Sequence, residues 1–317
     1  MNGFAQRMMK GRLGYGMSPE AVFKTLSVVR TIAGLLYPSR LLFYLWLLLF
    51  GFLYTARLAQ TLPMILVQPN LVKLVCAVGS ISLLFVYSKI INDIHDLAID
   101  RISNKGRPLV QGLIGTDEAS GLAAILLVIS GILAVAVKRD FFCLWLFIWG
   151  LSYVYSSPPF RLRRFWPVSH VVLALIGASV FMSGACIAGP EVFYTVRAGT
   201  DISMCILPAF FFLCHIKDLK DIEGDRAAGI WNLFGRVAHP GLWSLVFFGG
   251  FLASAFLTAV RAGVGMAATA AGGIICAVAA IFMVVRSRQP AELDRLFVLA
   301  LFFLLYLSGA WLFYFRG

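Results

Sequence analysis

Nine apolar stretches dominate this sequence and constrain its fold more than any other feature. They run near 41–57, 71–92, 119–137, 141–157, 168–189, 200–217, 241–260, 263–285 and 294–315. About 20 apolar residues are enough to cross the ~30 Å hydrocarbon layer as a helix. Lipid offers the backbone no hydrogen-bonding partner, and the alternating pattern of a membrane barrel does not appear, so all nine stretches are predicted to be helices. We therefore expect an all-α, multi-pass integral membrane protein with about nine transmembrane helices.

The distribution of charge predicts how these helices are oriented. The chain is 60% hydrophobic, 13% charged and carries a net charge of +12. With the N-terminus in the cytoplasm, the inner segments hold 20 of the 27 Lys and Arg residues, as cytoplasmic loops of membrane proteins do. We therefore assign the basic excess to topology and expect no nucleic-acid partner. The N-terminal segment 1–38 and the loops 93–118, 158–167 and 218–240 are predicted to be cytoplasmic, and the C-terminus to lie outside.

Two acidic motifs stand at helix ends on the predicted cytoplasmic side. Their members are Asp93, Asp96 and Asp100, and Asp218, Asp221 and Asp225. Both motifs use spacings of three and then four residues, which at about 100° per residue bring each trio within an arc of roughly 60° on one helix face. Like charges at this spacing repel each other, so a bound divalent cation is expected to offset the repulsion.

The residue types in these motifs suit a hard cation. Carboxylates without clustered His or Cys favour Mg²⁺, which binds a few carboxylates together with water and substrate phosphates. The alternative is that these residues are solvated loop acids. Against it, seven of the 15 acidic residues of the chain fall in two windows of ten residues. The motifs therefore predict a magnesium site that receives a phosphorylated ligand.

A basic loop between the two motifs offers groups that bind phosphate. Tyr155 is followed by Arg161, Arg163 and Arg164. A guanidinium group binds phosphate oxygens through two parallel hydrogen bonds, and a tyrosine hydroxyl can donate to the same group. The arginines could instead serve only to set membrane topology, and the same two interpretations apply to Arg107.

Three motifs in this order resemble the UbiA superfamily of intramembrane prenyltransferases. Asn92 to Asp100, followed by the stretch 104–109, is similar to the first signature of that family. Asp218 to Asp225 is similar to its second acidic motif, and 155–164 to its basic loop. The resemblance implies one domain over 1–317, with about nine helices bundled around a central cavity beneath a cytoplasmic cap. It also implies Mg²⁺-dependent transfer of a prenyl group from a prenyl diphosphate to an aromatic or other lipophilic acceptor within the membrane lipid, releasing diphosphate.

The resemblance also implies roles for individual residues. The catalytic residues would be Asn92, Asp93, Asp96, Asp100, Asp218, Asp221 and Asp225, of which the six aspartates would hold the metal. The substrate-binding residues would be Arg40, Arg107, Tyr155, Arg161, Arg163 and Lys217. Family members often carry a basic residue directly before a proline in the first helix. Here Tyr37 precedes Pro38, and Arg40 is the nearest cation.

Two other functions fit part of the pattern. A cation-coupled transporter also carries intramembrane carboxylates, but its ion sites usually lie near the midplane, between repeats of broken helices. Another membrane lipid-phosphate transferase would also use paired aspartate motifs, but its usual Gly- and Arg-spaced signature does not appear in this chain. We expect the prenyltransferase.

Overall fold

The structure is a computed structural model that describes residues 31, 34–58, 68–188 and 192–314. Most of the predicted N-terminal segment 1–38 lies outside the described residues. Within them, nine helices have 18 or more residues and no strand occurs. They are α3 (Pro38–Leu58), α5 (Gln68–His95), α7 (Thr116–Val137), α8 (Arg139–Ser156), α9 (Val168–Ala188), α10 (Val192–Ile216), α12 (Pro240–Arg261), α13 (Met266–Arg286) and α14 (Arg295–Tyr314). Each of the nine apolar stretches therefore coincides with a helix, to within a few residues at most ends.

Eight of these helices are long and apolar enough to cross a membrane. In the described part of the chain α8 is the exception, because its 18 residues include Arg139 and Asp140 at its start. The all-α prediction is confirmed. A ninth crossing by α8 stays a prediction.

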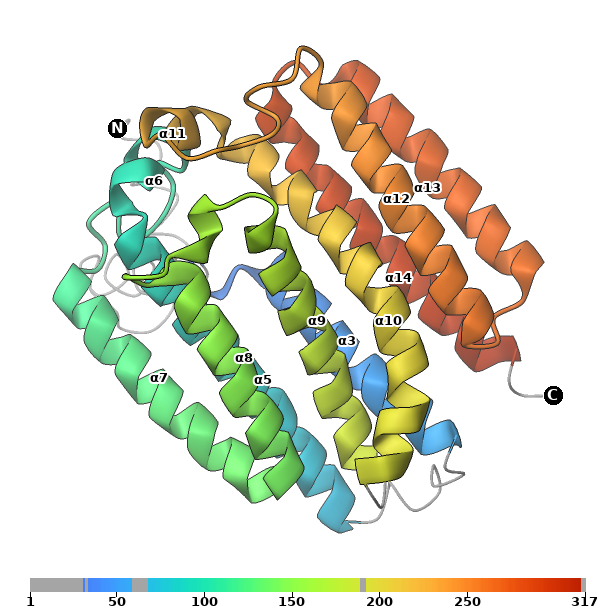
Figure 1. Cartoon of the computed structure of the whole chain (residues 1–317). Helices are drawn as coiled ribbons and strands as arrows, with labels where there is room; N and C mark the ends of the chain where they lie inside the picture. Colours follow the sequence, from blue (N-terminus) through green and yellow to red (C-terminus); the bar gives the residue numbers. More distant parts are fainter. Residues whose placement is uncertain (1–30, 32–33, 59–67, 189–191, 315–317) are drawn as a thin grey trace, which may run out of the picture.

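The long helices form one bundle in which α3, α9 and α10 lie between two outer groups (Figure 1). One group contains α5, α7 and α8, and the other contains α12, α13 and α14. Glycine allows α3 and α9 to pack backbone to backbone, since a Cβ on Gly184 would overlap the Leu48 carbonyl and one on Gly51 the Phe181 carbonyl. Small residues at a helix interface permit this close approach in membranes.

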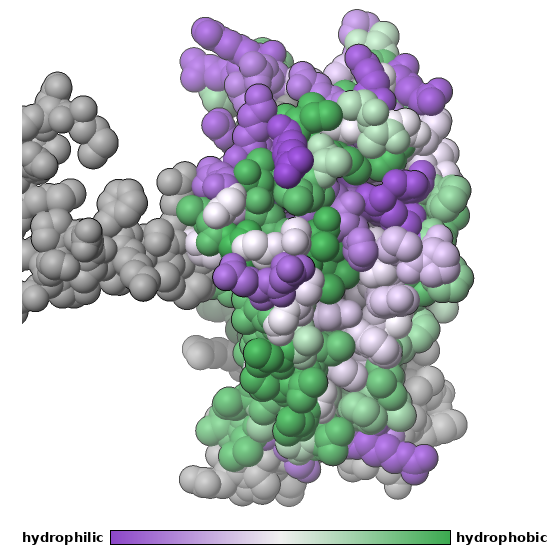
Figure 2. Space-filling model, turned by 90° about the vertical axis from the view of Figure 1, so that its left-hand side faces the viewer, coloured by the Kyte–Doolittle hydropathy of each residue, from purple (hydrophilic) through white to green (hydrophobic). Residues whose placement is uncertain are grey.

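The short elements gather at one end of the bundle. Figure 1 shows α6 (Leu97–Ser103) and α11 (Ile222–Ala227) side by side there, and the two helices are in contact. Hydrophilic residues are concentrated at the same end of the face shown in Figure 2, above a mostly apolar lower half. The polar end that the two acidic motifs predicted is therefore present.

The acidic motifs are not regular helices, and this corrects one expectation. The first motif bends at Asp96, which separates α5 from α6 (φ −100°, ψ 6°). The second runs from α10 through the 3₁₀ turn η2 (Lys217–Lys220) into α11. A regular helix would stack three buried like charges on one face. The bend lets Asp96 meet different cations from Asp93 and Asp100, so each carboxylate gains a partner.

Candidate active site

A cavity opens between the helices beside both acidic motifs. It has about 1170 Å³ of empty space, counting its open mouth. Six cationic side chains line its polar end: Arg40, Lys89, Arg107, Arg163, Lys217 and Lys220. Among the described residues that line it, Asp221 is the only carboxylate. A cavity with this excess of positive charge is suited to a multiply charged anion.

The other end of the same cavity is apolar. Its walls come from α5, α8, α9, α10 and α14 and include Ile81, Leu84, Ile148, Ile176 and Val180. Aromatic rings also line it: Tyr44, Phe85, Phe210 and Phe297. The cavity therefore joins an anion-binding end to a hydrocarbon-lined end.

The carboxylates of the first motif lie just behind the cavity wall and are paired with arginines. Arg107 contacts both Asp93, at 2.7 Å, and Asp100. Lys89 lies one turn before Asp93 and reaches it at 3.1 Å. These two aspartates are at most 2% exposed. Because buried charges are stable only when they are paired, the cations of the cavity hold this motif in place.

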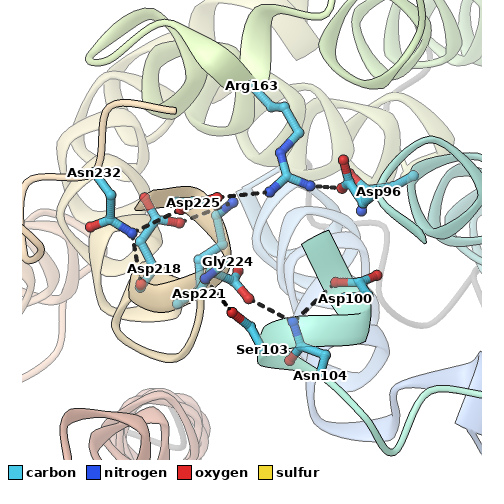
Figure 3. Close-up of polar contacts among 12 residues, drawn as sticks. Asp96, Asp100, Ser103, Asn104, Arg163, Asp218, Asp221, Gly224, Asp225 and Asn232 are labelled. Atoms are coloured by element: carbon cyan, nitrogen blue, oxygen red, sulfur yellow. Dashed lines mark hydrogen bonds and ion pairs between the residues drawn. The ribbon is translucent and has the colours of Figure 1, made fainter. Parts of the chain in front are cut away.

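Asp96 faces the basic loop, where Arg161 and Arg163 both contact it. Arg161 donates from Nη2 to Asp96 at 2.8 Å and to the His95 carbonyl at 2.7 Å. Arg163 lies between the two motifs and also reaches Asp225 at 3.4 Å (Figure 3). The third arginine of the loop, Arg164, is exposed to solvent. Two of the three arginines of the loop therefore contact the acidic motifs.

The second motif is held by neutral donors as well as by cations. Asn232 donates to Asp225 Oδ2 at 2.8 Å and to the Asp218 carbonyl at 3.0 Å (Figure 3). His170 Nε2 lies 2.9 Å from Asp218 Oδ2, and Lys217 Nζ lies 3.5 Å from Asp218 Oδ1. Asp225 is buried, whereas Asp218 and Asp221 are half-buried, and Asp221 lines the cavity.

A direct contact between α6 and α11 sets the distance between the two motifs. Asn104 Nδ2 donates to Asp221 at 2.8 Å and to Asp100 at 3.1 Å (Figure 3). The Gly224 N–H donates to Ser103 Oγ at 2.6 Å. Asp100 and Asp221 are thus bridged by a single amide, and the two acidic motifs face each other across the site.

Burial shifts the protonation of the last aspartate in each motif. It raises the pKa of Asp100 to about 6, although Arg107 opposes the shift. Burial likewise raises the pKa of Asp225 to about 6, opposed by the hydrogen bond from Asn232. The charged forms of these groups are costly without a cation nearby.

The other predicted substrate-binding residues also line the cavity. Lys217 Nζ donates to the Tyr155 hydroxyl at 2.7 Å. Arg40 pairs with Asp294 at 2.6 Å and lies over the Phe297 ring. Asn92 accepts a long hydrogen bond from Ser156 at 3.4 Å. Arg161 is the one predicted substrate-binding residue that is not part of the described cavity wall.

Comparison with known proteins explains this arrangement. The model of the UbiA prenyltransferase family matches residues 44–308. This chain belongs to the UbiA prenyltransferase family. Its structure is similar to that of a UbiA homolog from Archaeoglobus fulgidus bound to DMAPP and Mg²⁺, with a TM-score of 0.55 and 22% sequence identity. The match covers 88% of the present chain and 98% of the homolog. The two share a fold, and the chain is an integral, multi-pass membrane protein.

Among curated family members, the similarity covers part of each chain. Digeranylgeranylglyceryl phosphate synthase of Methanocaldococcus jannaschii is 28% identical over 161 residues, or 51% of this chain and 54% of that protein. Chlorophyll synthase of Avena sativa is 30% identical over 168 residues, or 50% of this chain and 43% of that protein. The chain thus spans about half the length of the curated relatives it matches.

The donor atoms of this UbiA family chain fit a magnesium ion. The described residues contain no preformed group of three or more His, Cys, Asp or Glu side chains at metal-binding distance. Mg²⁺ does not require one, because it commonly takes one or two carboxylates and completes its shell with water and substrate phosphates. Asp93 Oδ2 is a buried carboxylate oxygen for which the structure shows no hydrogen-bond donor. A hard cation is a suitable partner for such an oxygen.

Five residues at this UbiA family site escaped the sequence analysis: Lys89, Asn104, His170, Lys220 and Asn232. Lys89 had a signal, since it precedes Asp93 by four residues and so shares its helix face. Asn104 belongs to the stretch 104–109, which the family resemblance marked without a role for this residue, and Asn232 lies seven residues beyond Asp225, outside the three motifs. His170 is 48 residues from Asp218 in the sequence, and no local pattern joins them.

Proposed function

We propose that this chain transfers a prenyl group from a prenyl diphosphate to a lipophilic acceptor. The observation that carries the proposal is the two-ended cavity, with six Lys and Arg side chains at one end and an apolar, aromatic-lined interior at the other. A prenyl diphosphate has the same two-ended chemistry. The position of the acids also disfavours a cation-coupled transporter, because both motifs lie at one end of the bundle.

The cations of the cavity bind the diphosphate in this proposal. Arg107 and Arg163 present guanidinium groups to the cavity while each remains paired with aspartates behind it. Lys89, Lys217 and Lys220 add charges around the same space. These groups stabilise negative charge as it grows on the departing diphosphate, which is where fixed electrostatic groups contribute most to catalysis.

The aspartates supply the ligands for Mg²⁺. When bound, the ion supplies a Lewis acid that stabilises the leaving diphosphate. Asp93 offers an oxygen without a hydrogen-bond donor, and Asp218 and Asp221 are only half-buried. Asp100 and Asp225 are more buried than Asp218 and Asp221, and they are paired with Arg107 and Asn232 respectively. We infer that these two orient the outer groups and balance the charge of the arginines.

The apolar end of the cavity holds the prenyl chain and excludes water. Loss of diphosphate leaves an allylic cation, which water would otherwise capture. Aromatic faces stabilise cations, and the rings of Tyr44, Phe85, Phe210 and Phe297 line this part of the wall. The Tyr155 hydroxyl, which accepts a hydrogen bond from Lys217, lies at the boundary of the two ends.

The acceptor is proposed to be a lipophilic alcohol or an activated aromatic ring. The similar proteins are named for different products or substrates, among them digeranylgeranylglyceryl phosphate synthase, chlorophyll synthase and a probable homogentisate phytyltransferase. The family that this chain matches is named for prenyl transfer. This common step is what we carry over to the present chain.

Product analysis tests the proposal. The chain, purified in detergent or held in its own membranes, is incubated with Mg²⁺, prenyl diphosphates of increasing length and a panel of lipophilic alcohols and phenols. We expect mass spectrometry to detect one acceptor whose mass increases by a prenyl group, together with inorganic diphosphate. Addition of EDTA should stop both. Cation transport across proteoliposomes with no prenylated product would refute the proposal.

A further inference from the structure

His170 is a buried residue at the start of α9 that contacts a motif aspartate. It is 2% exposed, and its Nε2 lies 2.9 Å from Asp218 Oδ2. On the opposite side of the ring, Nδ1 lies 3.0 Å from Ser169 Oγ. Lys217 Nζ lies 3.5 Å from the other oxygen of the Asp218 carboxylate, Oδ1. One oxygen of Asp218 contacts His170, and the other lies beside Lys217, which lines the charged end of the cavity.

The imidazole ring is held in place by an aromatic stack. His170 stacks on His215 with ring centroids 3.7 Å apart and planes 15° apart. His215 in turn stacks on Phe247 at 4.1 Å and 10°. The edge of Phe211 contacts both histidines. A ring packed this tightly cannot rotate freely, so the direction of its N–H is set by the packing.

Hydrogen bonds determine which nitrogens carry protons. Trp166 Nε1 can only donate, so His215 Nε2 accepts from it at 3.1 Å, and His215 Nδ1 donates to the Phe211 carbonyl at 2.8 Å. His215 is therefore neutral. For His170, the carboxylate of Asp218 can only accept, so Nε2 carries a proton, and Nδ1 is hydrogen-bonded to the Ser169 hydroxyl.

We propose that His170 is a positioning residue that aims Asp218 at the metal. Its Nε2–H donates to Oδ2, so that Oδ1, which lies 3.5 Å from Lys217 Nζ, can act as a ligand of the Mg²⁺ that accompanies the diphosphate. Outer hydrogen bonds of this kind orient metal ligands, and their loss typically costs 10- to 100-fold in metal affinity or activity. The inference rests on the proposed function, because it presupposes that the motif binds metal with diphosphate.

Direct metal binding tests this role without relying on turnover. The detergent-purified chain is titrated with Mn²⁺ in the presence of inorganic diphosphate, and free Mn²⁺ is followed by electron paramagnetic resonance. His170→Asn and His170→Leu remove the donor at the Nε2 position, whereas His170→Gln places an amide N–H there. We expect the Mn²⁺ Kd to rise about 10- to 100-fold in the first two variants and less than about threefold in the third.

Two further variants separate positioning from packing. His215→Phe keeps an aromatic ring in the stack but does not touch Asp218, so its Mn²⁺ affinity should match the wild type. In an Asp218→Asn background, His170→Asn should add almost no further loss, because the contact it removes is already altered. Equal Mn²⁺ affinity of wild type, His170→Asn and His170→Leu would overturn the inference, and so would equal losses in His170→Asn and His170→Gln. Absence of diphosphate-dependent Mn²⁺ binding by the wild type would instead overturn the proposed function.

Discussion

Gly224 gives the sharpest test of whether the two acidic motifs must face each other at a set distance. It lies in α11, directly against α6, and precedes Asp225. A Cβ at this position would lie 2.5 Å from Ser103 Oγ, 2.7 Å from Ile99 Cγ2 and 2.9 Å from the Ile99 carbonyl oxygen. The two atoms of Ile99 cannot move aside easily, because one is a backbone oxygen and the other is a branched carbon close to the backbone. Substitution by alanine must therefore move α11 away from α6.

The geometry gives the size of the effect. Overpacking of this kind costs about 1–3 kcal/mol, and the hydrogen bond from the Gly224 N–H to Ser103 is worth about 1 kcal/mol. Separation of the helices also stretches the bond from Asn104 to Asp221, which is now 2.8 Å. A misplacement of about 1 Å at a reacting centre can cost on the order of 10² in rate. We therefore expect Gly224→Ala to lose roughly 100-fold in kcat but to remain folded.

A matched control is available in α8. Gly150 is also helical, and a Cβ there would meet no atom within 4 Å. Gly150→Ala should keep wild-type kcat and Tm. Both variants are measured by prenyl transfer at saturating Mg²⁺ and by thermal unfolding in detergent. If Gly224→Ala retains more than about half of the wild-type kcat, the close approach of α6 and α11 does not set the catalytic geometry and the reasoning is wrong.

Four other predictions follow from the site and the topology. The Asp93→Asn variant should insert into the membrane normally but lose about 10²- to 10⁴-fold in kcat, because it removes the carboxylate oxygen that has no hydrogen-bond donor. An activity above a tenth of wild type would contradict this. Arg163→Lys should raise KM for the prenyl diphosphate about tenfold without changing KM for the acceptor, whereas the exposed Arg164→Lys should be silent in the same kinetics. Phe210 lines both the site cavity and a neighbouring apolar cavity, and its ring separates the two. Phe210→Ala should therefore shift the preferred prenyl donor to a longer chain. An unchanged ratio of kcat/KM for short and long donors would argue against this. The Lys and Arg bias predicts that a reporter fused to the C-terminus lies outside the cytoplasm, and a cytoplasmic reporter would reverse the assigned orientation.

The sequence alone predicted the helices and the polar end of the bundle at which both acidic motifs lie (Figure 1). Helix positions followed from the lengths of the apolar stretches, because a bilayer requires both the apolarity and the internal hydrogen bonding of the backbone. The two acidic motifs stood out because their spacing repeats in a chain with few acids. The pairing of Lys89 with Asp93 also has a local signal in the sequence, because side chains four residues apart on a helix lie on the same face.

Only the tertiary structure decided which groups meet. Arg163 reaches Asp225 across 62 residues of sequence, and Asn104 reaches Asp221 across 117. At the bend, Asp96 likewise pairs with Arg161, which lies 65 residues further along the chain. Hydrogen bonds and ion pairs act over about 3–4 Å, a scale that the packing of separate helices sets and that local spacing does not encode.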